Sequence, residues 1–182
     1  MRRREFLLTA AAGLGAAGMS PPRAQRADAR ALERIAMMTL NFTTLLKTPG
    51  QPQGPDRTLD FFDLPQMYVD TYGVHNVELQ HYHMASTDPA YFQTLKARLD
   101  RAACKATQLV VEFGALNINA PDHNFLPRIQ VVDLTKVWID RCAMLDCPRI
   151  MVNQGQPTAE NRAMSIETLS AMAAYEIGRA HV

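Results

Sequence analysis

The chain has 182 residues, of which 47% are hydrophobic and 20% are charged, and its 19 basic and 18 acidic residues leave a formal net charge of +1. This composition is typical of a globular protein and excludes a disordered or fibrous chain. Because basic residues are not in excess, no nucleic-acid partner is expected.

The first residues predict an export signal rather than part of the fold. Arg3 and Arg4 open the stretch RREFL, which is similar to a twin-arginine signal, and the apolar run after it is too short to span a bilayer. We expect residues 1–29 to be a signal peptide and linker, and the protein to be exported to the periplasm without a stable membrane anchor after cleavage. The alternative is a disordered basic N-terminus.

From Arg34 onward, short apolar runs alternate with amphipathic segments. Asp63 is expected to cap the first helix, Pro65 to lie in its first turn and Gly73 to end it. The expected elements, in chain order, are strand 35–40, helix 63–73, strand 77–80, helix 86–102, strand 108–113, helix 129–145, strand 149–153 and helix 160–175.

Four successive βα units imply a parallel sheet covered by helices. Either an open doubly wound sheet or part of a (β/α)8 barrel satisfies this pattern. No G-x-G-x-x-G motif follows the first strand, which weighs against a nucleotide-binding doubly wound sheet.

The cysteines and the last residues give two further expectations. Cys104, Cys142 and Cys147 are expected to be buried small residues, although an exported protein could form a disulfide and the spacing of the second and third does not decide this. The final residues EIGRAHV, 176–182, break the preceding helical pattern and look like a translated sequencing adapter. The alternative is a genuine C-terminus.

Two segments carry a family resemblance. LDFFDLPQMYVDTYGVHNVELQ, 59–80, and LTKVWIDRCAMLDCPRIMVNQG, 134–155, resemble a helix and the following strand in the sugar phosphate isomerase/epimerase family, the xylose isomerase-like TIM barrels. The resemblance covers about residues 33–175 and implies that 30–175 form the N-terminal half, about four βα units, of a (β/α)8 TIM barrel. Unpaired sheet edges would then make the isolated chain self-associate.

Active sites of such barrels lie at the carboxyl ends of the strands. Because side chains alternate along a strand, Glu78 should point into the barrel, away from Val77 and Leu79. Glu78 and Glu112 are the expected catalytic residues, with a structural anchor as the alternative for Glu78. The expected substrate-binding residues are Asn41, His81, His83 and Asn153. Alternatively, the two histidines supply two metal ligands or lie at the surface.

The resemblance also implies chemistry. Relatives of this kind bind Mn, Mg, Co or Zn and move a proton next to a carbonyl with two carboxylates. Those ligands lie on later strands, so this chain is expected to hold no metal ligand itself. We expect a sugar isomerase/epimerase-like enzyme acting on a sugar or polyol, inactive as this fragment. The alternatives are a non-catalytic carbohydrate-binding barrel and, with less support, an endonuclease-like phosphodiesterase.

Overall fold

The structure is a computed structural model that describes residues 29–52, 54–113, 128–153 and 158–179. Residues 1–28 of the expected signal peptide and linker lie outside the described residues, as do 114–127, 154–157 and 180–182 of the expected tail. Within the described ranges, no helix is both long enough and apolar enough to cross a bilayer.

Strands and helices alternate in the predicted order. The strands are β1 (Ala36–Met38), β2 (Asn76–Gln80), β3 (Lys105–Val111) and β4 (Ile150–Val152). The α-helices are α2 (Ala29–Leu32), α3 (Leu64–Tyr72), α4 (Pro89–Arg101), α5 (Arg128–Met144) and α6 (Arg162–Arg179). Three short 3-10 helices are η1 (Thr39–Phe42), η2 (Phe61–Asp63) and η3 (His81–His83).

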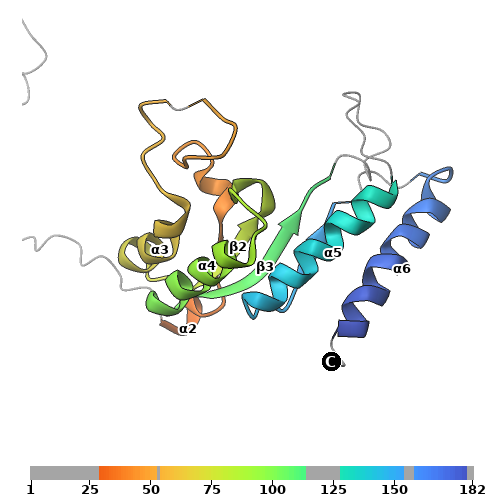
Figure 1. The fold of residues 1–182 in the computed structure, drawn as a ribbon. Coiled ribbons are helices and arrows are strands. Elements are labelled where there is room, and N and C mark those ends of the chain that lie inside the picture. Colours follow the sequence, from red (N-terminus) through yellow and green to blue (C-terminus); the bar gives the residue numbers. More distant parts are fainter. Residues whose placement is uncertain (1–28, 53, 114–127, 154–157, 180–182) are drawn as a thin grey trace, which may run out of the picture.

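The strands form one parallel sheet in the order β1-β2-β3-β4. Figure 1 shows the helices following one another across the molecule in chain order, from α3 to α6. A doubly wound sheet would reverse its strand order at a switch point, whereas successive units of a (β/α)8 barrel keep it. The predicted α/β class, with parallel strands and covering helices, is therefore confirmed.

One face of the sheet carries the core. Val77, Leu79 and Leu109 point toward the helices and are at most 1% exposed. The same cluster contains side chains from three successive helices, namely Tyr68 of α3, Phe92 of α4 and Trp138 of α5. Each large apolar side chain buried in this way stabilises the fold by about 1.5–3 kcal/mol.

The opposite face of the sheet is less covered. Glu78 is half-buried between the fully buried Val77 and Leu79, which is the alternation that a strand with one apolar face requires. The side chains of Gln108 in β3 and Met151 in β4 are also partly exposed to solvent. The prediction that Glu78 points away from the helices is confirmed.

The start of α3 differs from the prediction. Asp63 makes no side-chain capping bond, and Asp60 instead accepts a hydrogen bond from the Phe62 N–H at 3.0 Å. The reason is that η2 runs directly into α3, so Asp63 already has helical dihedrals and the free N–H groups lie one turn earlier. The helix ends as predicted, at Gly73 with φ 65°.

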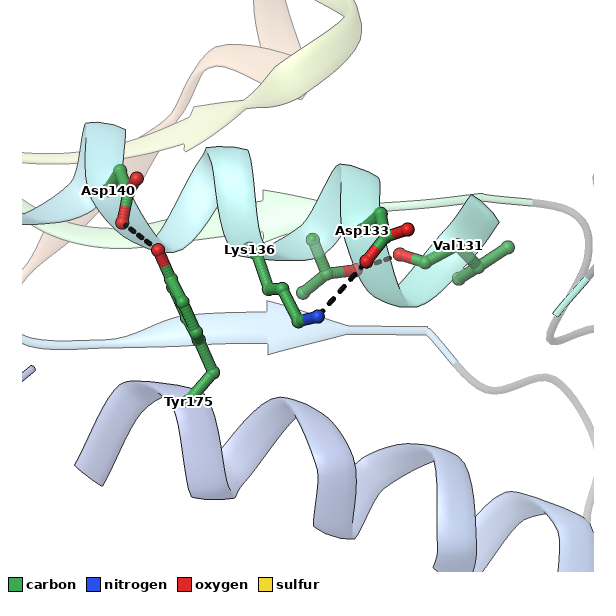
Figure 2. A network of polar contacts seen from close by, with 6 residues as sticks. Val131, Asp133, Lys136, Asp140 and Tyr175 are labelled. Carbon is green, nitrogen blue, oxygen red and sulfur yellow. Dashed lines mark hydrogen bonds and ion pairs between the residues drawn. The ribbon is translucent and has the colours of Figure 1, made fainter. Parts of the chain in front are cut away.

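The end of α6 also differs. The helix continues to Arg179 rather than breaking after Tyr175, because Glu176 and Ile177 suit a helix and one glycine costs only about 1 kcal/mol. Figure 2 shows Tyr175 reaching from α6 to α5, where its hydroxyl donates to Asp140 Oδ1 at 3.0 Å. Lys136 of α5 lies 5.9 Å from the centre of the same ring. The adapter origin of residues 176–182 stays a prediction.

Candidate functional site

The polar residues singled out by the sequence follow the carboxyl ends of the strands, except for Glu78, which lies within β2. β1 leads into η1, which contains Asn41, and β2 leads into η3, which contains His81 and His83. Glu112 and Asn153 are the first residues after β3 and β4. Neighbouring parallel strands end at the same edge of the sheet, so these residues gather there.

Three of them form one hydrogen-bonded group, the edge cluster of His81, Glu112 and Asn153. The Glu112 backbone N–H donates to His81 Nδ1 at 3.3 Å, and Asn153 Nδ2 donates to Glu112 Oε1 at 3.5 Å. The cluster therefore joins the ends of β2, β3 and β4. Glu112 and Asn153 are exposed and His81 is half-buried, so the cluster is open to a ligand.

The His81 ring is held against aromatic side chains. Its centre lies 5.1 Å from that of Phe113 and 5.5 Å from that of Trp138. Burial lowers the pKa of His81, while the Glu112 charge opposes this shift. Since Nδ1 accepts from the Glu112 N–H, we assign the ring proton of the neutral form to Nε2. Trp138 is buried and also supports this ring.

His83 does not face the edge, contrary to the prediction that it lies at the rim. Its side chain is 1% exposed. Both ring nitrogens are engaged: Nδ1 lies 3.0 Å from Thr39 Oγ1 and Nε2 lies 3.0 Å from Thr43 Oγ1. The prediction fails because η3 turns the chain directly after Gln80, so strand alternation no longer sets the side-chain direction.

The partners of these two threonines fix the direction of each hydrogen bond. Thr43 Oγ1 donates to the Leu40 carbonyl at 2.7 Å, so it must accept from His83 Nε2–H. Thr39 Oγ1 accepts from the Gln80 N–H at 3.0 Å and can donate its proton to His83 Nδ1. We call the hydrogen-bonded chain of Thr39, His83 and Thr43 the His83 relay. Every donor in this relay has an acceptor when His83 is neutral.

The electrostatics agree with a neutral ring. Burial, together with smaller electrostatic contributions from His81 and Arg57, lowers the pKa of His83 to about 4. Arg57 also donates to the carbonyls of Thr43 and Leu46, at 3.0 and 2.7 Å. His83 therefore ties the end of β1 to the end of β2 as a structural residue.

Glu78 is the exception noted above and does not join the edge cluster. It lines an open cleft of about 340 Å³ together with Arg34 and Arg149, on the less covered face of the sheet. Glu78 pairs with Gln108, four residues before Glu112, so the two carboxylates are offset by about 13 Å along the strands. Asn41 is exposed in η1.

Sequence reasoning missed Thr39, Thr43 and Tyr82. Tyr82 is 36% exposed, and its ring centre lies 4.5 Å from that of His83 and 5.7 Å from that of His81. Burial raises the pKa of its hydroxyl. Thr39 and Thr43 follow closely after β1, and this position could have indicated that their hydroxyls lie at the carboxyl edge of the sheet. Their pairing with a histidine about forty residues away leaves no mark in the sequence.

No three His, Cys, Asp or Glu residues within the described part of the chain are grouped so that they could hold a metal ion. The described residues thus do not by themselves supply the ligand set of the divalent ion that the family resemblance implies. The ion stays a prediction.

Comparison with known proteins gives a likeness among solved structures. Neither a family model nor a curated protein matches the chain. Among solved structures, the chain is similar to the xylose isomerase domain protein from Planctomyces limnophilus, with 19% sequence identity and a TM-score of 0.44. The match covers 57% of this chain and 42% of that protein, so it spans less than half of the length of the solved structure.

Proposed function

We propose that this chain belongs to a sugar isomerase- or epimerase-like enzyme in which a proton is moved at the carbon next to a carbonyl. The observation that supports the proposal is the edge cluster, in which His81, Glu112 and Asn153 meet at the carboxyl edge of a parallel sheet. In (β/α)8 barrels, this edge is where substrates bind.

Glu112 is the proposed proton-transfer group. It is exposed, and its position is fixed from two sides, by the His81 ring on its backbone and by the Asn153 amide on its carboxylate. A carboxylate held in this way can take a proton from a bound substrate, and general base catalysis contributes about 10²–10⁴-fold in rate. His81 acts through Glu112 and is a positioning residue.

The remaining polar residues have supporting roles in this proposal. Asn41 and Asn153 would hydrogen-bond to hydroxyl groups of a sugar or polyol, since an amide offers both donors and an acceptor. Glu78, beside Arg34 and Arg149, lies in a separate polar cleft and is proposed to balance their charge rather than to contact the reacting carbon. We also propose that the protein lies in the periplasm, which fits a substrate without phosphate.

Binding is the first test, because it needs only this chain. Titration with a ketose, an aldose and a polyol is followed by backbone amide NMR. The expected result is a concentration-dependent shift of the Glu112 and Asn153 amides, weakened in Glu112→Gln. Glu176→Gln is the matched control, since Glu176 is exposed on α6 and away from the cluster. Absence of any shift at the carboxyl edge would contradict the proposal.

Chemistry is tested with the full-length protein, by exchange of the proton next to the carbonyl for deuterium when the ketose is incubated in D₂O, with and without added Mn²⁺. Exchange that falls about 100-fold or more in Glu112→Gln supports general base catalysis by this residue. Binding without exchange would instead support the non-catalytic carbohydrate-binding barrel.

A further inference from the structure

Cys142 and Cys147 occupy a helix ending that brings their backbones together. Asp146 has φ 52°, the Asp146 N–H donates to the Ala143 carbonyl at 3.2 Å, and the Cys147 N–H donates to the Cys142 carbonyl at 3.0 Å. This is the Schellman motif, in which the residues at the two ends of the turn pack their side chains against each other. With this bond, the two Cα atoms cannot be more than about 7 Å apart, within reach of a disulfide.

The two sulfur atoms converge on one backbone oxygen. The carbonyl of Arg149 lies 3.4 Å from Cys147 Sγ and 3.8 Å from Cys142 Sγ. The same oxygen accepts the Leu109 N–H at 2.9 Å, where the pairing of β3 with β4 begins. Both side chains are buried, 6% exposed for Cys142 and 8% for Cys147. The thiols therefore share one small space at the start of β4.

The two thiols are not equivalent. A hydrogen bond from the Cys142 thiol lowers the pKa of Cys147, and burial opposes this effect. The same interaction raises the pKa of Cys142. The sulfur of Cys147 is therefore the more readily ionised one, and thiol–disulfide exchange requires the thiolate as its attacking group.

We propose that Cys142 and Cys147 are a redox-active dithiol that closes to a disulfide when a disulfide-bearing oxidant is available. The Cys147 thiolate attacks one sulfur of the oxidant, forms a mixed disulfide and expels the other sulfur as a thiolate. The Cys142 thiolate then attacks Cys147 Sγ and releases the second sulfur. The pair loses two protons and two electrons, and the oxidant disulfide is reduced to two thiols.

The third cysteine provides a matched control within the same fold. α4 ends in the same motif: Ala103 has φ 52°, and the Cys104 N–H donates to the Leu99 carbonyl at 2.8 Å. The position that corresponds to Cys142 is thus a leucine. Cys104 is 5% exposed, and burial raises its pKa to about 11. Helix ending and burial are alike at the two sites, and the second sulfur is the difference.

The experiment uses the intact folded chain and oxidised glutathione as the oxidant. After acid quenching, the chain is digested with trypsin without reduction. Cleavage after arginine and lysine places Cys142 and Cys147 together in peptide 142–149 and Cys104 in peptide 102–105. Peptide 142–149 is expected to lose about 2 Da, the mass of two hydrogens, while peptide 102–105 keeps its mass. Free thiols measured in denaturant fall from three to one.

Single variants separate the steps. Cys142→Ala is expected to stop at a mixed disulfide with glutathione on Cys147, Cys147→Ala to react slowly or not at all, and Cys104→Ala to oxidise like the parent chain. Circular dichroism of each variant checks that it folds. The proposal is overturned if the folded parent chain keeps three thiols, or if Cys104 reacts as fast as Cys147.

Discussion

Acid should weaken the fold through His83, and the structure allows the size of the effect to be worked out. His83 is buried and neutral within the relay that links it to Thr39 and Thr43. A proton added to Nδ1 would displace the Thr39 hydroxyl proton and place a charge near Arg57 and His81. Folding therefore opposes protonation of this ring.

The direction follows from the number of protons that each state binds. The unfolded chain protonates His83 near pH 6.5, whereas the folded chain does so only near pH 4. Between these values the unfolded state holds one more proton, so the free energy of unfolding falls as the pH falls. The slope is about 1.4 kcal/mol per pH unit, and the loss is complete, at about 3 kcal/mol, once the pH is below 4.

Urea unfolding between pH 7 and pH 4.5 measures this slope. His83→Gln is expected to be less stable at pH 7 by about 1–3 kcal/mol, since relay bonds are lost, but to show a flatter pH dependence. The control is His75→Gln, which removes an exposed imidazole and leaves the relay intact. Because carboxylates titrate in all three proteins, the difference in slope isolates His83. Equal slopes in the parent chain and His83→Gln would refute the reasoning.

Three further outcomes are expected. Thr39→Val should cost about 1–3 kcal/mol in urea unfolding, because it removes a fully buried hydroxyl that bonds on both sides, whereas Thr44→Val at an exposed site should cost under about 0.5 kcal/mol. Gly73→Ala should destabilise by about 1 kcal/mol at φ 65°, and Gly178→Ala, inside α6 with open space around it, should stabilise by about 0.5–1 kcal/mol. Sedimentation of the isolated chain should show self-association through the edges of β1 and β4; a concentration-independent monomer would count against it.

Local sequence patterns predicted those features of the fold that depend only on residues close together in the chain. The direction of Glu78 follows from the alternation of Val77 and Leu79, and the end of α3 follows from the need of a left-handed residue at Gly73. The burial of all three cysteines follows from their apolar surroundings. Boundaries were less exact: β1 ends at Met38 because η1 begins at Thr39, although the apolar run continues to Leu40.

What the sequence could not reveal depends on contacts between distant residues. His83 looked like an edge histidine because nothing near it in sequence shows that Thr39 and Thr43 enclose its ring. The closeness of Cys142 and Cys147 depends on the left-handed conformation of Asp146, which a non-glycine residue adopts only in a particular turn. Spacing alone could therefore not decide whether these two thiols meet.

The dithiol and the edge cluster lie at opposite ends of β4. Arg149, whose carbonyl holds both sulfur atoms, is four residues before Asn153, a separation of about 13 Å along the strand. Between them, β4 is paired with β3 from Leu109 to Val111, and this pairing holds the strand in register. Closure of the disulfide would remove two weak S–H donors at the start of β4 from a carbonyl that retains the Leu109 N–H. The Asn153 contact with Glu112 does not depend on those donors, so we expect the proposed oxidation to leave the proposed sugar binding unchanged.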